Sequence, residues 1–97
     1  MVRRMLRRVE ERYAGAFAEP ADAAALRSLI ELVDACLDIL EDPTIPHMVK
    51  IMEYYRAMNI IDFFCANCAG RVEWRALIGL RRDLARLLKE GLRRWGA

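Results

Sequence analysis

The chain has almost none of the side chains on which most enzyme chemistry depends. Its 97 residues include one Ser, one Thr, one His, two Asn and no Gln. A Ser-His-carboxylate triad would have to bring together Ser28 and His47, which fall on different predicted helices. We therefore expect a protein without catalytic activity, and a small enzyme or a thiol or metal protein ranks third among the functional hypotheses.

Glycine is also scarce, and its five residues form neither of the common phosphate-binding motifs. Their spacing fits neither GxGxxG nor the P-loop pattern. The sequence also contains no Glu-x-x-His pair, which excludes a ferritin-like di-iron bundle. We therefore predict that the protein carries no cofactor.

No apolar run is long enough to cross a membrane. The most apolar stretch, residues 45–70, is interrupted by Lys50, Glu53, Arg56 and Asp62, whereas a spanning helix needs about 20 predominantly apolar residues. The first eight residues hold four arginines and no apolar core, unlike a secretory signal. We expect a cytoplasmic protein with no membrane partner.

Three cysteines and one histidine could supply a Cys3His metal site by residue type alone. Cys65 and Cys68 form a CxxC pair, and Cys36 and His47 complete the set. If the two helices that carry them form a hairpin, Cys36 lies level with residue 51, roughly 21 Å along the helix from Cys65. Zinc ligands lie within about 2.3 Å of the ion. We therefore predict no metal site within one chain and interpret the thiols as structural, with an intermolecular metal or disulfide and a redox role as alternatives.

Apolar side chains with helical periodicity are what the chain has in abundance. They make up 56% of the residues and recur at spacings of three and four. Gly and Pro divide the sequence into four helical segments, at residues 2–18, 21–41, 45–67 and 71–95. We predict a single all-α domain, a compact four-helix bundle. An antiparallel up-down order is favoured, and irregular or orthogonal packing is the alternative.

The segment at 45–67 is predicted to be the central and most buried helix. Its polar residues recur every three positions, so they spiral around the helix instead of forming one polar face. A helix that is apolar all round is usually buried. The residues expected to be nearly inaccessible to solvent are Ile51, Met52, Met58, Ile61 and Phe64.

Polar side chains on a buried helix need partners, because burying an unpaired charge is costly. The polar set of this segment permits local pairing at a spacing of three residues. It forms an internal network, marks a place where the helix surfaces or bends, or lines a ligand pocket. The residues concerned are Tyr54, Glu53, Arg56, Asn59 and Asp62.

The net charge of +2 hides a strong asymmetry along the chain. Residues 1–18 carry +3, residues 19–42 carry −6, residues 43–70 balance at zero, and residues 71–97 carry +5. The acids of the second segment are expected to meet the arginines of the first. They are not expected to reach the basic stripe of the last segment, because the second and fourth helices of an up-down bundle lie on a diagonal. Arginine outnumbers lysine 14 to 2, a thermophile-like composition.

A basic stripe follows one face of the last predicted helix and is expected to lack an intramolecular partner. From Arg75 to Arg93 it extends over roughly 27 Å at the helical rise, long enough to follow several phosphates. It is a solvated face, a surface for RNA or DNA, or a surface for an acidic protein. The stripe consists of Arg75, Arg82, Arg86, Lys89 and Arg93.

Two functional hypotheses follow from the stripe and the surplus of apolar side chains. In the first, the chain is a non-catalytic helical subunit that self-associates or docks into a larger assembly and presents the stripe to a nucleic acid. A chain this short buries only about two-thirds of its unfolded surface, which favours a homo-oligomer or a hetero-complex. In the second, the chain is a protein–protein adaptor that binds no nucleic acid.

Overall fold

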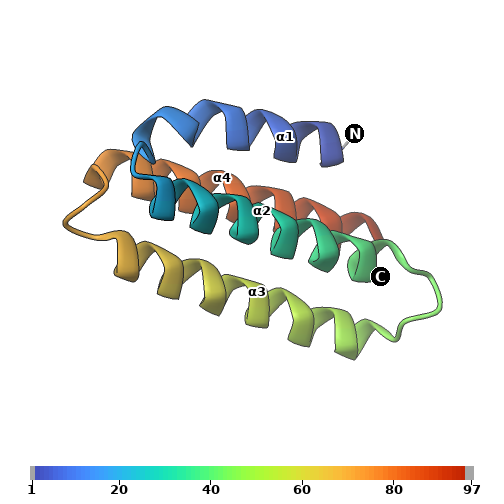
Figure 1. Cartoon of the computed structure of the whole chain (residues 1–97). Helices are drawn as coiled ribbons and strands as arrows, with labels where there is room; N and C mark the ends of the chain where they lie inside the picture. Colours follow the sequence, from blue (N-terminus) through green and yellow to red (C-terminus); the bar gives the residue numbers. More distant parts are fainter. Residues whose placement is uncertain (1, 96–97) are drawn as a thin grey trace.

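Within residues 2–95, which the computed structural model describes, the chain forms four α-helices and one short 3₁₀ turn. The predicted all-α four-helix bundle is confirmed. Helices that follow one another in the sequence run in opposite directions (Figure 1). The elements are α1 (Val2–Tyr13), η1 (Ala14–Ala16), α2 (Pro20–Glu41), α3 (His47–Cys68) and α4 (Trp74–Trp95).

The central layer of the bundle consists of α2 and α4. These two helices run in the same direction beside each other, and α1 and α3 lie on opposite sides of the pair (Figure 1). The diagonal that was expected to separate α2 from α4 is therefore short, and the two helices are in direct contact. Their facing side chains form the core, and each fully buried leucine contributes about 2 kcal/mol. Those with no accessible surface include Val33, Leu37, Leu40, Leu80, Leu84 and Leu88.

The prediction that residues 45–67 form the most buried helix is wrong. Of the five side chains expected to be inaccessible, only Ile61 is buried, and Met52 is exposed. α3 packs against α2 and α4 through one face, and its opposite face is apolar but open to solvent. An all-round apolar pattern shows only that a helix has little polar surface. It does not show whether the same chain covers every face of that helix.

The turns explain where α1 ends and where α4 begins, both of which differ from the prediction. Gly15 falls in η1, so the first helix stops at Tyr13 instead of continuing to residue 18; glycine is a poor helix former. At the end of α3, Gly70 has a φ of +92°, which glycine adopts without strain. The Arg71 N–H donates to the Cys68 carbonyl at 3.0 Å across this turn. α4 then begins at Trp74, three residues later than expected.

Candidate nucleic-acid interface

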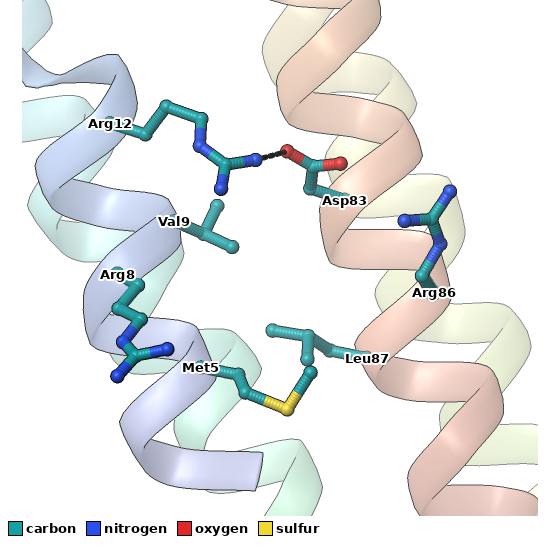
Figure 2. A pocket seen from close by; sticks show the side chains of 7 residues that line it. All are labelled: Met5, Arg8, Val9, Arg12, Asp83, Arg86 and Leu87. Atoms are coloured by element: carbon teal, nitrogen blue, oxygen red, sulfur yellow. Dashed lines mark hydrogen bonds and ion pairs between the residues drawn. The ribbon is translucent and has the colours of Figure 1, made fainter.

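The α1–α4 seam adds arginines from the start of the chain to the basic stripe of α4. A hollow of about 180 Å³ lies between the two helices (Figure 2). Apolar side chains from both helices face it, and arginines flank them. The lining consists of Met5, Arg8, Val9, Arg12, Asp83, Arg86 and Leu87. A ligand here would meet an apolar floor and a positively charged border.

A second, shallower hollow of about 280 Å³ follows the outer side of α4. Arg86 lines both hollows, so they adjoin along the helix. The second hollow is lined by Arg82, Ala85, Arg86, Lys89, Glu90 and Arg93. Together the two form one surface, which we call the α1–α4 surface. It contains four of the five residues predicted for nucleic-acid binding. The fifth, Arg75, is exposed in the first turn of the same helix.

Asp83 is the buried carboxylate of this surface, with a side chain only 7% exposed. It accepts hydrogen bonds from the Tyr13 hydroxyl at 2.7 Å, from Arg12 Nη1 at 3.0 Å and from Arg82 Nε at 3.3 Å. Burial by itself would raise the pKa of Asp83. The hydrogen bonds from Tyr13 and Arg82 and the charges of Arg82 and Arg12 outweigh burial, so the pKa lies below its usual value. Asp83 is therefore ionised at neutral pH and anchors α1 to α4.

A glycine makes room for this anchor. A Cβ atom at Gly79 would lie 2.5 Å from the Tyr13 hydroxyl oxygen, closer than such atoms approach each other. The missing side chain therefore lets the Tyr13 ring reach across α4 to Asp83. Burial and the hydrogen bond to Asp83 raise the pKa of Tyr13, so its hydroxyl remains a donor at neutral pH.

The expectation that the α4 stripe has no intramolecular partner is wrong for two of its five residues. Arg82 pairs with Asp83, and Arg93 Nη2 lies 2.7 Å from Glu90 Oε1. Both partners come from α4 itself. The hydrogen bond from Arg93 holds the pKa of Glu90 below its usual value. The Arg93–Glu90 pair is largely exposed, and exposed pairs contribute only about 0–1 kcal/mol, so a phosphate could replace Glu90. Asp83, by contrast, is buried.

The remaining cations of the stripe, together with Arg8 of the α1–α4 surface, have no carboxylate partner among the described residues. They are Arg75, Arg86 and Lys89 on α4 and Arg8 on α1. Sequence reasoning missed the contribution of α1. The signal was present, because residues 1–18 carry a net charge of +3, but that charge was expected to be taken up in part by the acids of α2.

One α1 arginine does meet the acids of α2, as predicted. Arg3 Nη1 lies 2.6 Å from Asp34 Oδ1, and Arg3 also pairs with Asp38 and, at 3.6 Å, with Glu41. Burial would lower the pKa of Arg3, but the hydrogen bond to Asp38 and the three carboxylate charges raise it. Arg3 is thus neutralised within the chain, unlike Arg8.

The polar set of α3 forms no buried network. Tyr54 is buried, but Arg56, Asn59 and Asp62 are exposed. Arg56 Nε pairs with Glu53 Oε2 at 2.8 Å on the same helix, and Asp62 pairs with an α4 arginine. Of the three interpretations of this set, the structure agrees with the one in which the helix surfaces. The buried cation of α3 is Lys50, which lies in the first turn of the helix and was not part of the predicted polar set.

Cys36 on α2 lies beside Glu53, well before Cys65 and Cys68 at the end of α3, as the hairpin geometry predicts. Cys36 Sγ lies 3.7 Å from the Glu53 carbonyl oxygen, and Cys65 Sγ lies 3.9 Å from that of Leu77. Burial raises the pKa of Cys36 to about 11 and also raises the pKa of Cys65 and Cys68. Since the thiolate is the reactive form, these thiols are poor nucleophiles. Among the described residues, no cluster of His, Cys, Asp and Glu has an arrangement that could hold a metal ion.

Comparison with known proteins identifies no relative. No family model, curated protein or solved structure matches the chain. In the part of the chain that the structure describes, no helix has the length and apolar character needed to cross a membrane. The chemistry of the chain's own surfaces is therefore the basis on which a function can be proposed.

Proposed function

We propose that the chain is a non-catalytic helical subunit that binds the phosphate backbone of a nucleic acid across the α1–α4 surface. The observation that carries this proposal is the excess of unpaired cations there. Arg8, Arg86 and Lys89 border the two adjoining hollows and have no carboxylate partner among the described residues. Unpaired arginines on a concave surface are suited to replace the counterions of a polyanion.

The dimensions of the surface support a nucleic acid as the polyanion. The stripe from Arg75 to Arg93 spans roughly 27 Å along α4, and α1 widens it by about one interhelical distance, 8–10 Å. A strand of that length places several phosphates within reach. Met5, the exposed apolar side chain of the first hollow, can contact the apolar face of an unstacked base, which duplex DNA does not expose. The proposal therefore favours a single strand bound with little sequence preference.

The test is the salt dependence of binding to a labelled single-stranded oligonucleotide. The variant Arg8→Ala/Arg86→Ala removes two unpaired cations and leaves Asp83 with all its partners. The matched control Arg27→Ala/Arg56→Ala removes the same charge from exposed positions on α2 and α3. Affinity of the first variant should fall, and its log–log salt slope should flatten by about 1.4, which is 0.7 for each lost contact to a single strand.

Two results would overturn the proposal. One is a parent protein that shows no salt-sensitive binding to RNA or DNA at about 50 mM salt, where phosphate contacts are strong. The other is a control variant that loses as much affinity as Arg8→Ala/Arg86→Ala, because binding would then follow net charge instead of the α1–α4 surface. Circular dichroism of all three proteins checks that helicity is unchanged.

The alternative is a protein–protein module that binds no nucleic acid. One observation favours it, namely the apolar face that α3 turns to solvent. Large exposed apolar patches mark interaction surfaces in soluble proteins. The same oligonucleotide titration distinguishes the two functions, since absence of salt-sensitive binding leaves only this alternative.

A further inference from the structure

The side of α3 that faces away from α2 and α4 carries a line of large apolar side chains. Successive members are three or four residues apart, which places them on one face of a helix. Each apolar member is 62–65% exposed, and one exposed asparagine interrupts the line. We call this line the α3 outward face; it consists of Met48, Met52, Tyr55, Asn59 and Phe63. From first to last it extends roughly 22 Å along the helix.

The face supplies more than half of the area that one subunit of a stable dimer contributes. Its four large apolar side chains present roughly 500 Å² of accessible surface, taking about 200 Å² for a fully exposed large side chain. A stable interface buries about 800 Å² on each partner. Trp74 and Ile78 are also exposed, in the first turns of α4, which pack beside the last turns of α3. Together these surfaces approach the area that a dimer needs.

The charges bordering the face are already neutralised within the chain. Arg56 is paired with Glu53 on one side of the face, and Arg81 is paired with Asp62 on the other. Two copies that meet here therefore bring together no excess of like charge. The α1–α4 surface, by contrast, carries a positive excess that repels a second copy of itself. A face that is apolar and locally neutral is complementary to another face of the same kind.

We propose that a second copy of this chain covers the α3 outward face, with the two α3 helices antiparallel and a two-fold axis passing beside Asn59. In that register the two Asn59 amides meet and can hydrogen-bond to each other. Tyr55 of each copy lies opposite Phe63 of the other, and Met52 lies opposite the small Ala66. One polar residue within an apolar seam is a known device for fixing the register of paired helices, and the contact is the same on both copies.

The first experiment measures the mass of the purified protein by sedimentation at micromolar concentration, without nucleic acid. The parent should sediment as two chains of 11.2 kDa. Met52→Glu should sediment as one chain, because it places a charge in the apolar contact. The matched control Ala24→Glu, at an exposed position on α2, should remain a dimer. Met52 is exposed in the single chain, so circular dichroism should show unchanged helicity in both variants.

The second experiment tests the register by cross-linking. In the variant Asn59→Cys, the new thiols of the two subunits would lie next to each other at the two-fold axis. Mild oxidation should therefore link the two chains by a disulfide. Ala24→Cys serves as the control and should cross-link far more slowly. The proposal is overturned by a parent that sediments as a single chain, by a Met52→Glu variant that remains a dimer, or by equal cross-linking of the two cysteine variants.

The dimer is independent of nucleic-acid binding, but it has a consequence that rests on the proposed function. Because α1 and α3 lie on opposite sides of the α2–α4 layer (Figure 1), the hollow between α1 and α4 remains open in each copy. The dimer then holds two nucleic-acid strands, and Met52→Glu should halve the number of strands per particle without changing the affinity per chain. Sedimentation without nucleic acid tests only the dimer, and the oligonucleotide titration tests only nucleic-acid binding. The failure of one proposal can therefore be distinguished from the failure of the other.

Discussion

α1 meets α2 along one edge and α4 along the other, and its arginines have different surroundings at the two seams. At the α1–α2 seam, Arg3 contacts three carboxylates, those of Asp34, Asp38 and Glu41. At the α1–α4 seam there are four arginines and a single carboxylate, that of Asp83, which pairs with two of them. These arginines are Arg8, Arg12, Arg82 and Arg86. At the first seam carboxylates outnumber arginines, whereas the second retains positive charge for an external anion.

The carboxylates of the two seams also differ in burial. The side chains of Asp34 and Asp38 are 46% and 67% exposed, and that of Asp83 is 7% exposed. Exposed ion pairs contribute about 0–1 kcal/mol, while a hydrogen bond to a buried charged group contributes about 1.5–3 kcal/mol. Asp83 therefore stabilises the fold and also lowers the positive charge of the surface. At the α1–α2 seam the carboxylates neutralise Arg3 but stabilise the fold little, because they are exposed.

The largest expected difference between the seams is in stability. Asp83→Asn keeps the shape of the side chain but removes the charge that accepts hydrogen bonds from Tyr13, Arg12 and Arg82. The free energy of unfolding should fall by about 2 kcal/mol. The matched change Asp34→Asn at the α1–α2 seam should cost less than about 1 kcal/mol. Urea denaturation measures both, and equal losses would show that the two seams do not differ in the way described.

The acid dependence of stability sharpens the same contrast. The pKa of Asp83 is below its usual 3.8 in the folded chain, so its contribution is complete above about pH 5 and is lost as the pH falls further. Each proton taken up on unfolding changes the free energy by up to about 1.4 kcal/mol per pH unit. The stability difference between the parent and Asp83→Asn should therefore shrink between about pH 4 and pH 2. A constant difference across that range would contradict a depressed pKa at Asp83.

Much of this architecture is readable from helical periodicity. The patterns placed α2 within one residue at its start and at its end, because Pro20 and the Asp42-Pro43 break punctuate it. Which helix is the most buried could not be predicted from the sequence. α3 has apolar side chains on all sides, but its outward face is exposed, whereas α4 carries a basic stripe and still lies in the central layer. Periodicity reports how much apolar surface a helix has, and packing decides which part is covered.

Only part of the candidate site could be predicted from the sequence. The five basic residues of α4 were correctly placed on one face, since their spacing alone determines that. The pair of Arg93 with Glu90 follows from a spacing of three residues and could have been predicted. The addition of Arg8 and Arg12 could not. It depends on which flank of α1 faces α4, and hence on the handedness of the bundle, which the spacing within each helix does not determine.

The smallest expected effect concerns a single exposed carboxylate in each region. Glu90 pairs with Arg93 and Arg94 on the α1–α4 surface, and Glu31 lines the α1–α2 seam near Arg7. Glu90→Gln and Glu31→Gln change the net charge equally, and each should alter stability by less than about 1 kcal/mol, since exposed ion pairs contribute little. Only Glu90→Gln releases an arginine onto the proposed binding surface. Its oligonucleotide affinity should rise and its log–log salt slope should steepen by up to about 0.7, the value for one added phosphate contact on a single strand. An equal gain in both variants would mean that the oligonucleotide responds to the overall charge of the chain and does not distinguish one seam from the other.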